Sequence, residues 1–177
     1  MLITLQWLKE KGACDAAKER FATEYPEGGD YQEILNKLAE ENNADWAQWL
    51  MQAAGPVDTV LEVDELTTEA SLFFAGRIII KGALKVAKGL FSGEGIKAGR
   101  GIEAGWGIEA GEGIEAGRGI EAGWGIKAGR GIEAGEDYGI YAGLELSISL
   151  KAKYAKVIAK ERPKNLLLGE FKERRVS

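Results

Sequence analysis

The sequence predicts an α+β protein in which a small helical module precedes a parallel β-solenoid, a triangular β-helix with about 18 residues per coil. Three observations predict it: helical spacing of apolar residues near the N-terminus, a six-residue repeat through the middle of the chain, and 25 Gly against 3 Pro. We divide the chain into a helical module (residues 1–54), a solenoid (57–139) and a C-terminal β cap with a basic tail (140–177).

The helical module shows three sets of apolar residues at a helical period. They fall at positions 14, 17, 21 and 25, then 31, 34, 35 and 38, then 46, 49, 50 and 53. Pro and Gly at 26–29, Asn42-Asn43 and Gly55-Pro56 separate or end these segments, so the module has three or four helices. A core of about 54 residues is marginal alone, and we expect it to dock on the solenoid. Cys14, Trp46 and Trp49 are expected to be buried in it.

The repeat Gly-Ile-(Glu/Lys)-Ala-Gly-X begins before the glycine-rich stretch. Within each hexad the aliphatic residue and the residue two positions later are apolar or small, which is typical of a short strand with one buried face. An aliphatic residue occupies the same hexad position every six residues from Val60 to Ile132. The residues between them are Leu66, Leu72, Ile78, Leu84, Leu90, Ile96, Ile102, Ile108, Ile114, Ile120 and Ile126. The solenoid is therefore expected to start near residue 60.

A longer period of 18 residues is superposed on the hexads. Residues 93–106 match residues 111–124 except for Lys97 against Glu115. Three hexads per coil fit a triangular β-helix, with Gly-X-Gly turning each corner through the φ freedom of glycine. Thirteen hexads predict a little over four coils. The handedness stays open, because Ala follows the aliphatic residue instead of preceding it.

Two other structures are compatible with parts of this pattern. Four-residue strands in an antiparallel meander would also use Gly-X-Gly turns. Residues 72–91 also fit a cationic amphipathic helix on a membrane surface, since Arg77, Lys81, Lys85 and Lys88 lie at helical spacing. Glycines near the hexad corners favour the solenoid for this segment, and we expect no membrane contact.

The C-terminal segment is expected to cap the solenoid and to form a homodimer. Apolar and polar residues alternate over residues 144–154, which predicts a strand, and an exposed solenoid end is usually capped or paired. Residues 138–177 also carry 9 basic and 4 acidic side chains in a chain of net charge −5. The candidate dimerisation residues are Leu146, Ile148, Leu150, Tyr154, Leu166, Leu167, Leu168 and Phe171, and the candidate basic end is Lys151, Lys153, Lys156 and Lys160. Four lysines are too few for strong direct binding of nucleic acid.

The composition excludes most catalytic chemistry. The chain has no His and one Cys, so it cannot build an imidazole base, a Cys/His zinc cluster or a disulfide framework from its own residues. The repeated Gly-X-Gly-X-X-Gly matches are corners and not a dinucleotide site. We expect no catalytic residue, no metal and no cofactor, and therefore a protein that is not an enzyme. The first residues lack the pattern of a secretory signal, so we expect a cytoplasmic protein.

The outer surface of the solenoid is the candidate protein-binding site. An 18-residue coil stacks Trp106 on Trp124 and aligns like charges in columns, and paired exposed tryptophans are typical of interaction surfaces. The alternative is a soluble surface whose columns only reflect repeat duplication. The candidate protein-binding residues are Trp106, Trp124, Arg100, Arg118, Glu103, Glu121 and Glu112.

Over residues 60–137 the repeat resembles, by architecture, the repetitive β-helix proteins of phages, plasmids and other mobile elements, such as the pentapeptide-repeat proteins that mimic DNA. Residues 13–50 resemble short helical modules that precede repeats in such proteins. The resemblance implies inhibition of a nucleic-acid enzyme. Our leading hypothesis is a non-enzymatic inhibitor of a host defence nuclease system, an anti-CRISPR or anti-restriction protein that binds a nuclease or CRISPR effector complex in the host cytoplasm. The alternatives are a structural or adaptor repeat protein and, more remotely, a membrane-surface binder through residues 72–91.

Overall fold

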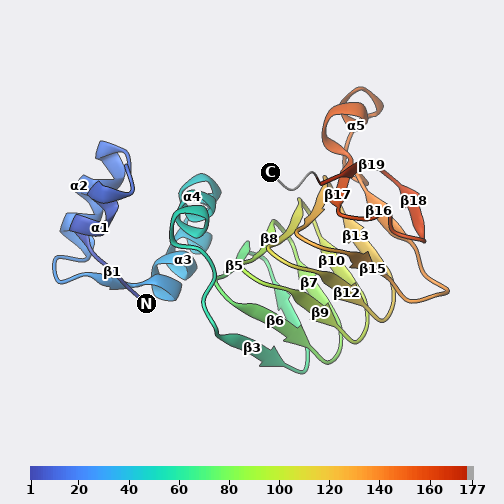
Figure 1. Ribbon diagram of the computed structural model, residues 1–177, viewed down its shortest axis with the longest axis horizontal. Helices are drawn as coiled ribbons and strands as arrows, with labels where there is room; N and C mark the ends of the chain where they lie inside the picture. The colour runs from blue at the N-terminus through green and yellow to red at the C-terminus, as the bar shows by residue number, and fades with distance from the viewer. Residues whose placement is uncertain (175–177) are drawn as a thin grey trace.

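The computed structural model describes residues 1–174 and confirms the predicted fold class. A helical module lies at one end of a parallel β-solenoid, and successive coils of the chain then stack on one another toward the C-terminus (Figure 1). Two apolar clusters match these two parts, one within the module and the first coil and one along the solenoid axis.

Four helices and one two-stranded pairing form the module. The helices are α1 (Leu5–Glu10), α2 (Asp15–Glu24), α3 (Tyr31–Glu40) and α4 (Ala44–Ala54), and β1 (Leu2–Ile3) pairs antiparallel with β2 (Gly29–Asp30). The side chain of Asp30 accepts hydrogen bonds from the first backbone N–H groups of α3, and Asn43 caps α4 in the same way. Polar residues therefore begin the helices at the breaks that the sequence indicates.

The module docks on the first coil of the solenoid, as expected. The third helix, α3, contacts the edge of the solenoid through Gln32, whose side-chain amide donates to the carbonyl oxygen of Phe73 at 2.8 Å and accepts from the N–H of Ala75 at 3.0 Å. Phe73 and Ala75 are buried in the same apolar cluster as the helices. Gln32 thus satisfies one donor and one acceptor of a strand edge, as a neighbouring strand would.

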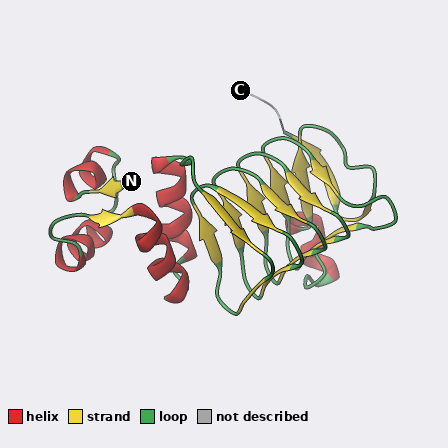
Figure 2. Cartoon of the chain, turned by 90° about the horizontal axis from the view of Figure 1, so that it is seen from below, coloured by secondary structure: helices red, strands yellow, loops and turns green. Residues whose placement is uncertain are grey.

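The solenoid has three walls of parallel strands (Figure 2), which rules out the antiparallel meander. The first sheet contains β3 (Val60–Val63), β6 (Arg77–Ile80), β9 (Ile96–Ala98), β12 (Ile114–Ala116) and β15 (Ile132–Glu133). The second sheet contains β4 (Leu66–Thr68), β7 (Leu84–Val86), β10 (Ile102–Ala104), β13 (Ile120–Ala122), β16 (Ile140–Ala142) and β18 (Leu166–Leu168). The third sheet contains β5 (Leu72–Phe74), β8 (Leu90–Ser92), β11 (Ile108–Ala110), β14 (Ile126–Ala128), β17 (Lys156–Ala159) and β19 (Glu170–Glu173).

Glycine at the corners serves close packing between coils, and not the φ freedom that the sequence suggested. No corner glycine of the hexads has a positive φ. A Cβ added to Gly111 would instead lie 2.0 Å from the carbonyl oxygen of Gly93 in the coil below, a distance that real Cβ atoms do not show. The second glycine of the same corner, Gly113, has more room, with its nearest neighbour at 3.6 Å. At this corner the first glycine of Gly-X-Gly is therefore the one that the stacking requires.

The strand register differs from the sequence pattern at the first coil. Leu61, and not Val60, pairs with Ile78, so Val60 points outward with 52% of its surface exposed. Residues 72–91 lie in β5 to β8, so the alternative prediction of a cationic amphipathic helix is wrong. Its lysines and arginine lie outside the coil because the apolar residues between them line the core.

The solenoid extends beyond residue 139. The thirteen hexads form β3 to β15, which make a little over four coils as predicted, and β16 to β19 extend the solenoid to about six turns. The pairing continues because Ile140 stacks on Ile120, Val157 on Ile126 and Phe171 on Val157 after the hexad spacing is lost. Residues 140–174 therefore add coils to the solenoid in addition to ending it.

The strand predicted over residues 144–154 is wrong, because this segment leaves the solenoid wall. Gly143, with a φ of 86°, turns the chain outward, and the helix α5 (Ile148–Tyr154) lies beside the solenoid near its C-terminal end (Figure 1). Alternation favours a strand only where a neighbouring strand accepts its hydrogen bonds. Without that neighbour, the segment satisfies its backbone within a helix.

Candidate protein-binding face

The columns predicted from the 18-residue period are present. The N–H of Trp124 donates to the carbonyl oxygen of Trp106 at 3.0 Å, and the N–H of Arg118 donates to that of Arg100 at 3.3 Å. Glu103 and Glu121 are direct partners in the pairing of β10 with β13. Each pair occupies the same position in successive coils.

Six of the seven predicted residues gather around one wall. The arginines lie at the corner before the second sheet, Glu103 and Glu121 on its outer surface, and the tryptophans at the corner after it. We call this the second-sheet face, defined by Arg100, Arg118, Glu103, Glu121, Trp106 and Trp124. Glu112 does not belong to it, because it lies at the corner between the third and first sheets and pairs with Arg130 at 2.9 Å.

The second-sheet face combines exposed indoles with a shallow groove. Trp106 and Trp124 expose 40% and 47% of their surfaces. The groove has a volume of about 380 Å³, and its lining includes Glu103, Glu121 and Glu145. Carboxylates therefore dominate the charge of the groove, whereas Lys88 lies directly below Trp106 in the tryptophan column.

Charges on this face are partly paired. Lys85 pairs with Glu103 at 3.0 Å, and Arg100 pairs with Glu65 at 3.5 Å. Within residues 1–174, neither Glu121 nor Arg118 makes an ion pair, although the guanidinium of Arg118 lies 6.0 Å from the ring of Tyr138. The upper coil of the face thus offers one acidic and one basic group for a partner.

The helix α5 continues the tryptophan corner. The ring of Tyr154 lies 5.8 Å from that of Trp124, and the ammonium of Lys153 lies 4.8 Å from the Tyr154 ring. A hydrogen bond to the Tyr154 phenol raises the pKa of Lys153. The sequence pattern indicated two separate surfaces for the tryptophans and the α5 residues, because a strand over residues 144–154 would not bring them together.

The predicted dimerisation residues do not share one environment. Leu146 is buried within the subunit at 8% exposure because it packs beside Gly143, so it cannot lie at a dimer contact. On α5, Ile148, Leu150 and Tyr154 are exposed. At the end of the solenoid Leu167 is exposed, whereas Leu166, Leu168 and Phe171 are half-buried.

The four lysines of the predicted basic end are spread over several elements. Lys151 and Lys153 lie on α5, and Lys160 follows β17. Lys156 pairs with Glu170, so its side chain is largely covered. They do not form one basic patch.

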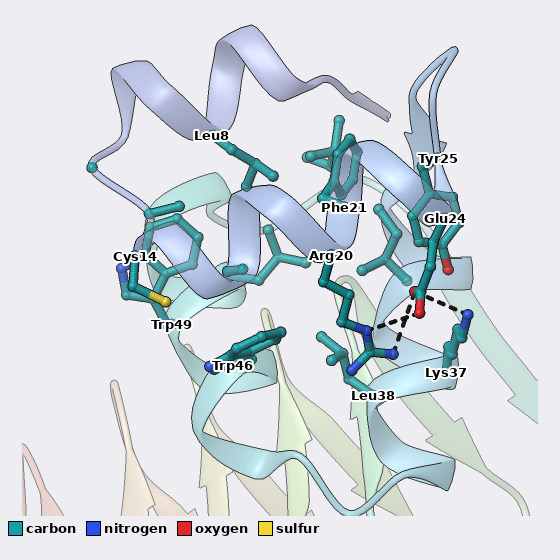
Figure 3. Close-up of a pocket in the computed structure, with 16 residues that line it drawn as sticks. Leu8, Cys14, Arg20, Phe21, Glu24, Tyr25, Lys37, Leu38, Trp46 and Trp49 are labelled. Carbon is teal, nitrogen blue, oxygen red and sulfur yellow. Dashed lines mark hydrogen bonds and ion pairs between the residues drawn. The ribbon is translucent and has the colours of Figure 1, made fainter.

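A second concave feature, a crevice in the helical module, was not expected from the sequence. It lies between the α1–α2 pair and the α3–α4 pair and has a volume of about 290 Å³ (Figure 3). Its walls are mostly apolar and include Phe21, Trp46 and Trp49. The two tryptophans are half-buried there instead of fully buried. Helical spacing shows which residues face inward, but it does not show that two helix pairs leave a gap.

Charged residues close one end of the crevice. Arg20 donates to Glu24 at 2.9 Å and to Glu41 at 2.6 Å, and Lys37 lies 3.0 Å from Glu24. Hydrogen bonds from Arg20 and Lys37 lower the pKa of Glu24. These contacts join α2 to α3 across the gap.

Cys14 lies at the rim of the crevice and is exposed, contrary to the expected burial. It occupies the N-cap position of α2 and therefore precedes the buried face of the helix.

Within residues 1–174, no three or more Cys, Asp or Glu side chains are grouped closely enough to hold a metal ion. Among the helices of the same residues, none has the length and apolarity needed to cross a membrane.

Residues 1–54 match the family model described as the YdhT N-terminal domain. The matched range is the helical module, and the solenoid lies outside it. No curated protein and no solved structure matches the chain.

Proposed function

We propose that this chain is a non-enzymatic interaction protein that binds a protein partner through the second-sheet face. The observation that carries the proposal is the exposure of Trp106 and Trp124 one above the other beside a carboxylate groove. Tryptophans dominate the binding energy of many protein interfaces, because one side chain buries a large apolar area and donates a hydrogen bond.

The rigidity of the solenoid favours binding at this face. The N–H groups of Trp106 and Trp124 donate to the coil below, and the preceding Gly105 and Gly123 have no space for a side chain. Binding therefore costs little conformational entropy in the backbone that carries the indoles. A loop with the same residues would lose more freedom on binding.

The charge of the groove suits a basic partner. Glu103, Glu121 and Glu145 lie beside the tryptophans, and Glu121 has no ion pair within residues 1–174. Proteins that hold nucleic acid present Lys and Arg to phosphates, and the same surface attracts carboxylates. We therefore propose a nuclease complex of a host defence system as the partner, with inhibition of the anti-CRISPR or anti-restriction kind and action in the host cytoplasm.

The test is an interference assay in cells that carry an active CRISPR or restriction system. Expression of the chain is expected to restore propagation of a targeted plasmid or phage. Trp106→Ser combined with Trp124→Ser should abolish this effect, whereas Val60→Ser, which changes an exposed apolar residue on the first sheet, should not. Unchanged interference on expression of the intact chain would contradict the inhibitor proposal.

A further inference from the structure

The two ends of the third sheet differ. At the N-terminal end, the amide of Gln32 satisfies Phe73 and Ala75 at the edge of β5. At the C-terminal end, the part of the chain that the structure describes pairs β19 with β17 on one side only. An uncovered strand edge with free N–H and C=O groups is a template for another strand.

The register of β19 shows which backbone groups are free. The N–H groups of Glu170 and Arg174 donate to the carbonyl oxygens of Ala155 and Ala159 in the coil below. In a parallel ladder alternate residues point to opposite sides, so Phe171 and Glu173 direct their N–H and C=O groups to the open edge. Within residues 1–174 these groups have no strand partner.

The other edges at this end are less suited to pairing. Residues 160–165 cross the end of the first sheet at β15. The backbone N–H of Lys160 donates to the carbonyl oxygen of Arg130 before β15, and the side-chain amide of Asn165 donates to that of Gly135 after it. This covering segment contains Pro163, which has no N–H for a ladder. Strand β18 has an irregular register against β16. Among the strands that the structure describes at this end, β19 has a regular register and an open edge.

We infer that two copies of this chain join end to end through β19, which pairs antiparallel with its counterpart about a two-fold axis at Phe171. In this register the two Phe171 residues exchange backbone hydrogen bonds. Glu170 then lies opposite Lys172 of the partner subunit, and the two-fold axis makes this contact twice. The sequence of the strand, Glu-Phe-Lys, is therefore complementary to itself in charge.

The neighbouring register is less favourable. A shift that places Phe171 opposite Glu173 of the partner subunit also places Glu170 opposite Arg174 of the partner subunit, but it brings Lys172 opposite Lys172 of the partner subunit and sets a carboxylate against the apolar ring of Phe171. Both Glu170 and Lys172 are exposed on the outer surface, where such contacts form.

The dimer also covers the open end of the apolar core. Phe171 packs against the solenoid core but stays half-buried, because no coil formed by residues 1–174 lies above it. Pairing through β19 places the same residue of the partner subunit over it and joins two six-stranded sheets into one. This contact does not involve the second-sheet face and does not depend on the proposed function.

The test measures sedimentation of the full chain at tens of micromolar, without any other protein. The intact chain is expected to be a dimer. Lys172→Glu should raise the dimer dissociation constant about tenfold or more, because two attractive contacts become repulsive. Lys164→Glu, at the same end but outside β19, is the matched control and should leave the dimer unchanged.

A mixing experiment identifies the register. Glu170→Lys also removes the ion pair with Lys156 of the same chain, and it should weaken self-association. An equimolar mixture of Glu170→Lys and Lys172→Glu chains should nevertheless form a heterodimer, because the two chains then carry opposite charges at the facing positions. Circular dichroism of both variants is the control for folding. A monomeric intact chain, a head-to-tail polymer, or a Lys172→Glu chain that dimerises as well as the intact chain would overturn the inference and leave the interference assay unaffected as a test of the second-sheet face.

Discussion

The backbone N–H of Trp124 donates to the carbonyl oxygen of Trp106 at 3.0 Å, so two indoles 18 residues apart occupy one corner of successive coils. The same corner continues into α5, where the ring of Tyr154 lies 5.8 Å from that of Trp124. A repeated sequence and an inserted helix thus contribute to one continuous aromatic surface.

A charged side chain in the core of the solenoid is expected to destabilise the folded chain. Ile114 is fully buried between coils, so Ile114→Asp should destabilise the chain by about 3 kcal/mol or more, because an unpaired carboxylate would enter the core. Urea unfolding measures this loss.

The matched control is Glu115→Gln at the adjacent outward position. Glu115 pairs with Lys97 at 2.9 Å on an exposed surface, and such pairs contribute about 0–1 kcal/mol. Equal effects of the two substitutions would contradict the inward position of Ile114.

The two glycines of one corner are expected to differ in their tolerance of a side chain. A Cβ at residue 111 would lie 2.0 Å from the carbonyl oxygen of Gly93, so Gly111→Ala should separate the coils and cost about 2 kcal/mol or more. At Gly113 the nearest atom is 3.6 Å away and φ is not positive, so Gly113→Ala should change stability by about 0.5 kcal/mol or less. Thermal unfolding of both variants is the measurement. If Gly113→Ala were the more destabilising substitution, backbone conformation, and not contact between coils, would determine where the corner requires glycine.

Most of the solenoid was predictable because its side-chain period is strict. Wherever Ile and Ala recur every six residues, the inward positions and the columns follow directly, as at Ile96 and Ala98. The prediction failed where this period stops. After Gly143 the alternation of the sequence continues, but the position of the neighbouring strand depends on a turn that the pattern does not encode.

Residues of the candidate site were predictable to different degrees. The 18-residue duplication was enough to place Trp106 above Trp124. The proximity of Tyr154 was not predictable, because it depends on a helix inserted between two strands far apart in sequence. The crevice of the module was missed for a similar reason, since it arises from the packing of whole helices.

Gln32 is expected to hold the helical module on the solenoid. Gln32→Ala removes one hydrogen bond to Phe73 and one from Ala75, and should cost about 1–3 kcal/mol, since both backbone groups are part-buried. Hydrogen exchange of the Ala75 amide measures the loss directly and should become faster. Gln6→Ala, which removes an exposed hydrogen bond to Glu10, is the control and should leave that amide protected. Unchanged exchange in Gln32→Ala would show that apolar contacts alone hold the module.

The ion pairs across the crevice predict a dependence of stability on pH. Hydrogen bonds from Arg20 and Lys37 lower the pKa of Glu24 below its ordinary value of 4.5 in the folded chain. A carboxyl group with a lowered folded pKa stabilises the protein above its unfolded pKa, and this contribution is lost as the pH falls through the folded pKa. Above pH 5 the contribution is therefore complete, and below the lowered pKa it is absent.

Glu24→Gln should consequently destabilise the chain at pH 7, and this destabilisation should be smaller at pH 3. The side chains are partly exposed, so the difference at pH 7 should be about 1 kcal/mol and should shrink in 1 M salt. Urea unfolding followed by tryptophan fluorescence suits this measurement, since Trp46 and Trp49 line the crevice. Glu27→Gln is the control, because Glu27 is exposed and makes no ion pair within residues 1–174, so its effect should be small at both pH values. A Glu24→Gln penalty that is as large at pH 3 as at pH 7 would show that the side chain acts through packing and not through its charge.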